Sequence, residues 1–175
     1  MHEEPAAHTE IHPATPEQEP ILRNMLELYI HDFSQFVPLE LGPDGRFGYP
    51  SLSLYWSDPD RFPLLIHTDG KLAGQALVKK ESASSATGAV WDLAEFFILR
   101  AYRRRGVGLK AAHQLWAKFP GPWQVRVMQS NQPACAFWQT AIEAFTGAVI
   151  DPEAIENQAR KWDVFLFQST AAGEK

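Results

Sequence analysis

The sequence predicts a mixed α/β fold, and three features carry this prediction. Residues 92–99 are almost continuously apolar and aromatic, as expected of a strand buried on both faces. Residues 107–119 place an apolar side chain at every fourth position, which is the spacing of a helix. The runs 63–67 and 71–80 meet at Asp69-Gly70, a strong signal for a two-residue hairpin turn. Helices that connect successive strands further imply that part of the sheet is parallel.

The N-terminal part of the chain predicts a strand followed by a helix. A short strand is expected at 9–12. Residues 15–18 read as a helix start, with threonine as the cap, proline in the first turn and glutamine three residues on. Pro20 moves the expected start a few residues later. A second helical piece is expected around 32–37. The apolar face of the first helix consists of Ile21, Leu22, Met25, Leu26, Leu28 and Tyr29.

Residues 38–60 have no clean period and carry several glycines and prolines. A loop of this length is either disordered or functional. Its large apolar side chains indicate that it packs on something, and two interpretations stay open: a cover over the substrate site or a structural flap. These side chains are Phe47, Tyr49, Leu52, Tyr55 and Trp56.

The strand at 92–99 follows a flexible connection at 81–88 and leads into a turn rich in arginine and glycine. Gly106 and Gly108 remove Cβ atoms where the backbone must turn sharply and approach a neighbour. The next helix begins here, and a helix N-terminus presents unpaired N–H groups and a partial positive charge. We therefore predict an anion site, although neither G-x-G-x-x-G nor a P-loop motif is present. The basic residues around it are Arg103, Arg104, Arg105 and Lys110.

The C-terminal part predicts a short buried strand at 123–128, where apolar residues alternate. Asn131 is a plausible N-cap for the helix that follows. A strand is then expected at 146–150, a polar segment with one or two helical turns at 151–160, and a closing strand at 162–167. The apolar stripe of the helix consists of Ala134, Phe137, Trp138, Ala141, Ile142 and Phe145.

Length and composition limit the classes of protein to which this chain can belong. A chain of 175 residues suits one domain, expected at 9–168, with loose tails at 1–8 and 169–175. The net charge of −5 disfavours a nucleic-acid partner. A single cysteine, Cys135, excludes an intrachain disulfide and fits a reducing cytosol. Because the sequence has neither a long apolar run nor a signal-peptide core, we expect a cytoplasmic protein with no membrane partner.

Three stretches resemble the GNAT superfamily of N-acyltransferases. Arg103-x-x-Gly106-x-Gly108 is similar to its Arg/Gln-x-x-Gly-x-Gly/Ala signature, and the strand at 123–128 has a counterpart there. Residues 131–138 are similar to the family's Asn-x-x-Ala-x-x-x-Tyr helix start. The likeness covers roughly 9–167 and is greatest to small, poorly characterised bacterial members. It implies a GNAT-like, mostly antiparallel sheet with splayed central strands and flanking helices.

The resemblance also implies acetyl-coenzyme A (acetyl-CoA) as the acyl-donor cosubstrate. In the family, backbone amides of the glycine turn hold the pyrophosphate, and the fourth strand pairs with the pantetheine arm. Carried over, the strand residues are Phe97, Ile98 and Leu99, and Asn131 points at the same arm. The residues of the turn are Arg103, Arg104, Arg105, Gly106, Val107, Gly108 and Leu109.

Glu95 is the candidate catalytic base. A carboxylate in an apolar strand is costly unless it faces a cleft or has a partner. Alternation places Glu95 on the same face as Phe97 and Leu99, and partial desolvation would raise its pKa toward neutrality. The resemblance agrees, since an acidic residue at this point often serves as base. A purely structural carboxylate remains the alternative.

The sequence departs from the family at Trp138, where many relatives have a tyrosine that protonates the leaving thiolate. Indole has no useful proton to give, and core packing is the favoured interpretation of Trp138. A coenzyme A thiolate is a tolerable leaving group, so the acid is not indispensable. The tyrosines that could protonate the thiolate instead are Tyr29, Tyr49, Tyr55 and Tyr102.

We therefore expect an N-acetyltransferase that moves an acetyl group directly to a primary amine, on a small molecule or a peptide. A non-catalytic acyl-CoA sensor with the same fold is the alternative, and a homodimer is left open. No metal site is expected, because the spaced pair His8 and His12 lies in a proline-flanked segment near the N-terminus.

Overall fold

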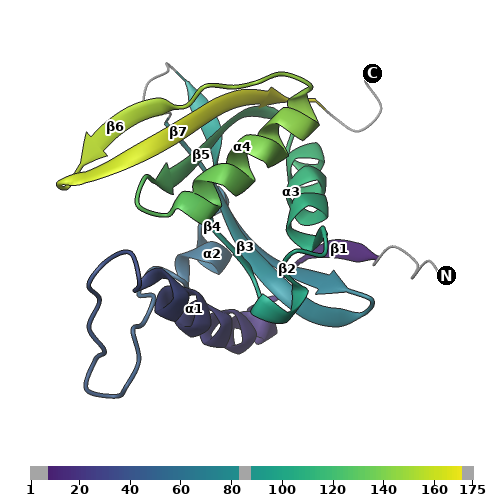
Figure 1. Ribbon diagram of the computed structural model, residues 1–175. Helices are drawn as coiled ribbons and strands as arrows, with labels where there is room; N and C mark the ends of the chain where they lie inside the picture. Colours follow the sequence, from purple (N-terminus) through teal and green to yellow (C-terminus); the bar gives the residue numbers. More distant parts are fainter. Residues whose placement is uncertain (1–7, 83–87, 171–175) are drawn as a thin grey trace, which may run out of the picture.

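The computed structural model describes residues 8–82 and 88–170 and contains a seven-stranded sheet (Figure 1). The strand order is β1-β2-β3-β4-β5-β7-β6, and β4–β5 is the parallel pair among antiparallel neighbours. This is the mixed, mostly antiparallel α/β fold that the sequence predicts. The strands are β1 Thr9–Pro13, β2 Arg61–Thr68, β3 Lys71–Ser82, β4 Ala89–Ile98, β5 Gly121–Met128, β6 Glu153–Asn157 and β7 Arg160–Ser169.

Helices cover both faces of the sheet (Figure 1). Helices α3 (Val107–Lys118) and α4 (Gln132–Thr146) pack over one face, in a core that includes Trp116 and Trp123. Helices α1 (Glu19–Phe33) and α2 (Leu54–Ser57) pack over the other, where Leu22 and Tyr55 meet Phe97. Two short 3-10 helices, η1 (Pro16–Gln18) and η2 (Arg100–Tyr102), precede α1 and follow β4.

The start of α1 agrees with the sequence, and its end does not. The Thr15 amide donates to the Gln18 side chain at 3.0 Å, which is half of a capping box, and α1 proper begins at Glu19. The helix continues to Phe33, so the separate helix expected at 32–37 is wrong. The sequence places Leu28 on the apolar face, but this side chain is 52% exposed. It lies outside the stripe of Leu22, Met25 and Leu26, which faces the sheet.

The hairpin between β2 and β3 is confirmed. Asp69 and Gly70 both have left-handed backbones, with φ of 49° and 74°, as a type I′ turn requires. Of the predicted connection at 81–88, residues 83–87 lie outside the described part of the chain.

Strand β4 contains a bulge. Leu77 of β3 pairs with Glu95, while the next residue, Val78, pairs with Leu93, so Ala94 has no partner in the ladder. The extra residue changes which side chains share a face: Leu93 belongs to the α3/α4 core, while Ala94 and Phe97 belong to the α1/α2 core. Glu95, two residues before Phe97, follows the α1/α2 side, as the sequence predicts.

Strands β4 and β5 separate soon after they meet. Their ladder has two registered pairs, Trp91 with Trp123 and Asp92 with Gln124. The splay that the family resemblance implies is therefore present. It leaves the second half of β4 without a neighbour on that side and opens the sheet between its two layers of helices.

The C-terminal part corrects the prediction. In place of a strand at 146–150, Gly147 ends α4 with a left-handed φ of 74°. In place of helical turns in 151–160, the chain forms β6 and a hairpin turn at Gln158 and Ala159, whose φ angles are 52° and 58°. Strand β6 is an exposed, polar edge strand, so it lacks the apolar alternation by which strands are recognised.

Among the described residues, no helix combines the length and the apolar character that crossing a membrane requires.

Candidate active site

Two adjoining hollows follow the gap between β4 and β5. The larger, here called the groove, has a volume of about 840 Å³ and extends past the start of α3. The smaller, here called the inner cavity, measures about 300 Å³ and reaches Glu95 and Arg126. They share one wall, so the groove leads toward the inner cavity. The shared residues are Tyr29, Phe33, Phe96, Asn131, Ala134 and Trp138.

The glycines of the turn serve the two purposes that the sequence predicts. Gly106 is the N-cap of α3 and has a φ of 76°, a left-handed conformation that favours glycine. Gly108 lies close to α4, because a Cβ at this position would stand 3.3 Å from Cζ of Phe137. Helix α3 therefore starts directly beside α4, and Gly106, Gly108 and Leu109 at its start line the groove.

Most of the predicted cofactor residues line the groove, and three do not. Leu99 donates its amide to Ala73 of β3 at 2.9 Å, so this N–H is engaged in the sheet. The Val107 side chain is buried in the core, and Arg105 is exposed away from the groove lining. The residues that do line it are Phe97, Ile98, Arg103, Arg104, Gly106, Gly108, Leu109 and Asn131.

Arg103 is held by the protein itself. Its Nε donates to the carbonyl of Ile98 at 2.7 Å, its guanidinium lies 5.5 Å from the ring centre of Phe97, and Nη2 lies 2.6 Å from Oδ2 of Asp32. Arg100 bonds the other oxygen of Asp32. Burial alone would raise the pKa of Asp32, but the two arginines hold it below its ordinary value. Asp32, at the end of α1, is an acidic neighbour of the turn that the sequence did not reveal.

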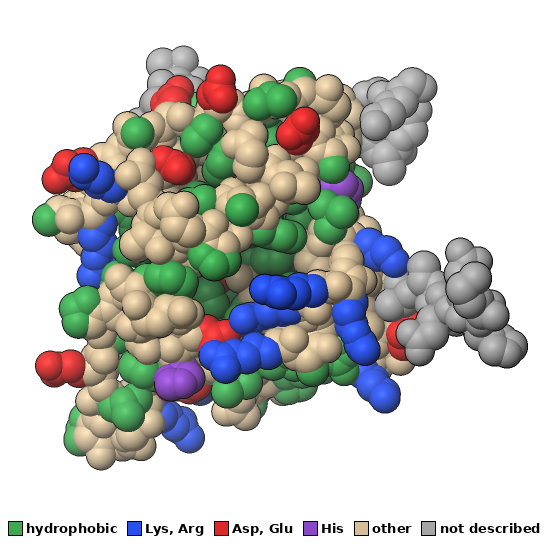
Figure 2. All heavy atoms as spheres, in the orientation of Figure 1, with side chains coloured by type: hydrophobic (Ala, Val, Ile, Leu, Met, Phe, Trp, Pro, Cys, Tyr) green, Lys and Arg blue, Asp and Glu red, His purple; other side chains and the backbone are tan. Residues whose placement is uncertain are grey.

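The surface view shows the same arrangement. A hollow with hydrophobic walls opens in the middle of the face in Figure 2, and Lys and Arg side chains gather along one side of it. The groove lining includes Arg100, Arg103 and Arg104. A ligand with an anionic end and an apolar arm would match this distribution of charge.

Glu95 lies in the inner cavity beside two phenols. Tyr49 donates to Oε1 of Glu95 at 2.9 Å, and the Tyr29 phenol is near enough to this carboxylate to lower its pKa. Burial raises the pKa of Glu95 above its ordinary value, against the opposing effect of the two phenols. The raised pKa suits a proton acceptor that works near neutral pH.

Tyr49 comes from the long loop after α1. This loop is fastened to α1, because the amides of Phe47 and Gly48 both donate to the carboxylate of Glu27 at 2.8 Å. Tyr55, in α2, is buried against the same face, and burial together with the charge of Glu95 raises its pKa to about 12. The loop thus packs over the Glu95 side of the sheet, in agreement with both open interpretations of it.

A buried ionic network lies beside Glu95 and was missed by the sequence analysis. Asp92 is fully buried, and its carboxylate accepts hydrogen bonds from Nε and Nη2 of Arg126 at 3.0 and 2.8 Å. Gln124 donates to the same carboxylate at 2.9 Å, and Nζ of Lys79 lies 3.7 Å away. The signal was present, because a second carboxylate in an apolar strand needs a partner as much as Glu95 does.

Trp138 is a core residue, as the favoured interpretation of the sequence holds. It is 7% exposed, and its ring centre lies 5.1 Å from Phe96, 4.7 Å from Phe137 and 6.2 Å from Trp116. Trp138 still belongs to the walls of both hollows. The family's tyrosine position therefore faces the site here with an indole.

Asn131 caps α4, as the sequence predicts. Its Oδ1 accepts the amide of Ala134 at 3.2 Å, so the side-chain oxygen is engaged. Asn131 also lines both hollows, where the side-chain amide group is the part left to meet a ligand.

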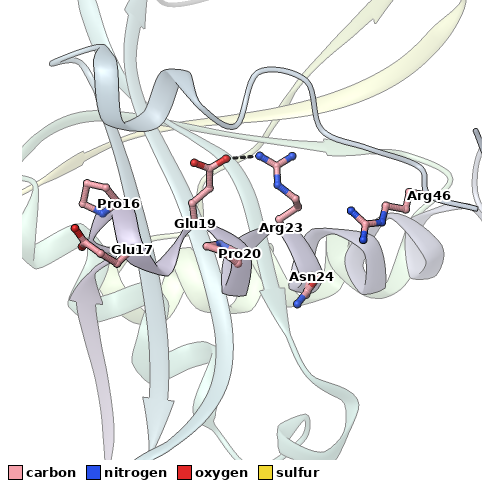
Figure 3. A pocket seen from close by; sticks show the side chains of 7 residues that line it. All are labelled: Pro16, Glu17, Glu19, Pro20, Arg23, Asn24 and Arg46. Atoms are coloured by element: carbon pink, nitrogen blue, oxygen red, sulfur yellow. Dashed lines mark hydrogen bonds and ion pairs between the residues drawn. The ribbon is translucent and has the colours of Figure 1, made fainter. Parts of the chain in front are cut away.

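A further hollow lies on the outer side of α1 and has a different character (Figure 3). Its lining contains the ion pair of Glu19 and Arg23 together with Arg46 from the long loop. None of the predicted site residues takes part, so it is separate from the gap between β4 and β5.

Comparison with known families gives one match. Residues 22–141 match the Acetyltransferase (GNAT) family. This segment runs from the start of α1 to α4 and includes the whole wall shared by the groove and the inner cavity. None of the curated proteins matches the sequence.

Solved structures with a similar fold include three of note. An acetyltransferase from Thermus thermophilus is 18% identical with a TM-score of 0.64, over 93% of this chain and 98% of that one. NAA60 of Arabidopsis thaliana in complex with acetyl-CoA is 14% identical with a TM-score of 0.57, over 92% and 98%. Arabidopsis thaliana Naa50 in complex with the bisubstrate analogue CoA-Ac-MVNAL is 15% identical with a TM-score of 0.55, over 91% and 98%. At these identities the likeness establishes the fold.

Proposed function

Because the chain belongs to the acetyltransferase (GNAT) family, we propose that it transfers an acetyl group from acetyl-CoA directly to a primary amine. The observation that carries this proposal is the gap between β4 and β5, which joins a basic glycine turn at one end to a buried carboxylate at the other. We also propose that 9–168 acts as one acyltransferase domain.

The groove fits acetyl-CoA in shape and charge. The amides at the start of α3 and the exposed Arg104 would hold the pyrophosphate, because a helix N-terminus favours anions. The apolar walls from Phe96 to Ile98 would hold the pantetheine arm along the unpaired side of β4. The NAA60 complex, which contains acetyl-CoA in a protein of this fold, supports the assignment. The cosubstrate supplies the activated acetyl group as a thioester.

The inner cavity would receive the amine. Glu95 accepts a proton from the entering ammonium group, and the neutral amine then attacks the thioester carbonyl. Apolar walls such as Val125, Val127 and Trp162 exclude water and favour an acceptor with an apolar portion next to its amine. Small molecules and peptide N-termini both meet this description, and the bisubstrate analogue bound to Naa50 supports the second class.

One observation favours a second candidate, an acyl-CoA sensor without activity. The family's tyrosine is replaced by Trp138, whose indole cannot protonate a leaving thiolate. The raised pKa of Glu95 argues for the enzyme, because a sensor has no use for a tuned base.

Turnover decides between the two. The protein is supplied with acetyl-CoA and a panel of aromatic and aliphatic amines, amino acids, polyamines and peptides, and release of free thiol is measured. Calorimetry with acetyl-CoA runs in parallel. Binding with turnover of any amine supports the transferase, and binding without turnover favours the sensor. If neither coenzyme A nor its acetyl ester binds, both candidates are wrong.

A further inference from the structure

The structure offers a different source for the proton that Trp138 cannot give. The chain has four tyrosines, at positions 29, 49, 55 and 102. Of these, Tyr29 lines both the groove and the inner cavity, whereas the other three belong to the lining of neither. A phenol at Tyr29 therefore stands where the acyl donor and Glu95 would meet.

The position of Tyr29 is fixed on two sides. Its ring centre lies 5.8 Å from that of Phe97 in β4 and 6.0 Å from that of Phe33 in the next turn of α1. Its phenol is close enough to Glu95 for the two groups to influence each other's pKa. Ring packing against two elements leaves the side chain little freedom, as a group that transfers a proton requires.

Tyr29 alone would be a poor acid. Burial, followed by the charge of Glu95, raises its pKa well above the ordinary value of a phenol. A thiol has an ordinary pKa of about 8.5, so proton transfer from an isolated Tyr29 to a thiolate would be unfavourable. Tyr29 can give up its proton if another arrives at the same moment, and protonated Glu95 is the neighbouring group that can supply it.

We propose that Tyr29 relays a proton from Glu95 to the sulfur of the departing coenzyme, in the role that position 138 leaves vacant. The inference rests on the proposed function and adds a catalytic residue to it. It is carried by the placement of one phenol in the walls of both hollows, beside the base, and by the ring contacts that hold it there.

The step balances as follows. Glu95 takes one proton from the ammonium group, the amine nitrogen forms a bond to the acetyl carbon, and the carbon–sulfur bond breaks. As the sulfur leaves with the electron pair, Tyr29 gives it the phenolic proton and receives the proton of Glu95. The second proton of the nitrogen passes to solvent as the amide forms. Glu95 returns to a carboxylate, Tyr29 to a phenol, and the coenzyme leaves as a thiol.

The test compares two leaving groups in single turnover, so that the chemical step itself is measured. Tyr29→Phe keeps the ring contacts and removes the O–H. The donors are acetyl-CoA and the acetyl selenoester of coenzyme A, whose selenol is a far stronger acid and leaves without a proton. Tyr49→Phe is the matched control, because it also removes a phenol from Glu95 but lies outside both hollows. Thermal melting verifies that both variants are folded.

We expect Tyr29→Phe to slow acetyl transfer from acetyl-CoA by about 10²-fold and to regain nearly the wild-type rate with the selenoester. Tyr49→Phe should show the same modest change with both donors. Tyr29→Phe at half the wild-type rate or more with acetyl-CoA would overturn the relay and leave the transferase standing. An equal loss with both donors would also overturn it, because Tyr29 would then only support Glu95. If the wild type turns over no amine, the proposed function fails first and the relay with it.

Discussion

The phenol of Tyr49 and the carboxylate of Glu95 form a hydrogen bond of 2.9 Å across 46 positions of sequence. One partner comes from the long loop after α1 and the other from the strand beside the gap. The bond favours the charged carboxylate and so opposes the burial that raises its pKa. The loop therefore takes part in setting the pH at which Glu95 can accept a proton.

Tyr49→Phe should move the acidic limb of the pH–rate profile to higher pH. Loss of the bond removes an effect that lowers the pKa of Glu95, so the base becomes protonated at a higher pH. A hydrogen bond to a charged group is worth about 1.5–3 kcal/mol, so its loss should displace the limb measurably. The profile of kcat/KM reports this pKa in the free enzyme. An unmoved limb would show that Glu95 does not control it.

Glu95→Gln should lower kcat by about 10²-fold or more, with little change in the affinity for acetyl-CoA. The amide keeps the shape of the side chain and removes the base, so the acidic limb should disappear. Turnover measured from roughly pH 5 to pH 9 tests both effects. Near-normal turnover with an unchanged profile would leave the structural interpretation of Glu95.

The same variant should be more stable than the wild type at alkaline pH. The folded-state pKa of Glu95 is raised, so its burial costs stability above that pKa and costs none below the unfolded value of about 4.3. The melting temperature of Glu95→Gln should therefore exceed that of the wild type at pH 8, by about 2–4 °C for each kcal/mol, and converge with it toward pH 4. A constant difference across this range would contradict the linkage.

Arg103→Ala and Arg104→Ala should have different effects. Arg103 is bonded to Ile98 and Asp32, so its removal should lower stability by about 1–2 kcal/mol. Arg104 is exposed on the groove, so its removal should weaken acetyl-CoA binding about fivefold and leave the melting temperature unchanged. Calorimetry and thermal melting of both variants separate the roles. Equal losses of affinity with unchanged stability would assign both arginines to the phosphates.

Arg126→Met should destabilise the fold by about 3–5 kcal/mol, because it leaves the buried Asp92 without its bidentate partner. Denaturant unfolding measures the loss. The double variant Asp92→Asn/Arg126→Met is the control, since it removes both charges and should recover most of the stability. A single variant as stable as the wild type would mean that Gln124 and Lys79 suffice to hold the carboxylate.

The sequence by itself determined the parts whose cause is local. Gly106 takes a left-handed backbone, Asn131 caps α4 by accepting the amide of the third residue after it, and Asp69-Gly70 forms the hairpin turn. Each depends on a few neighbouring residues and their allowed conformations. The strand at 92–99 could also be predicted, because a continuous apolar run indicates a strand buried on both faces. Strand β6 was not predicted, because an exposed edge strand has no apolar pattern in its sequence.

The tertiary structure alone decided which groups meet at the site. Asp32 contacts Arg103 across 71 positions, and Tyr49 meets Glu95 across 46. The bulge at Ala94 changes the alternation along β4, so the position of Asp92 relative to Glu95 does not follow from counting residues. Only the tertiary structure likewise shows that, of the four tyrosines, Tyr29 lines both hollows. Such contacts follow from how the helices and strands pack on one another. Periodicity and local conformational preference in a single sequence do not specify that packing.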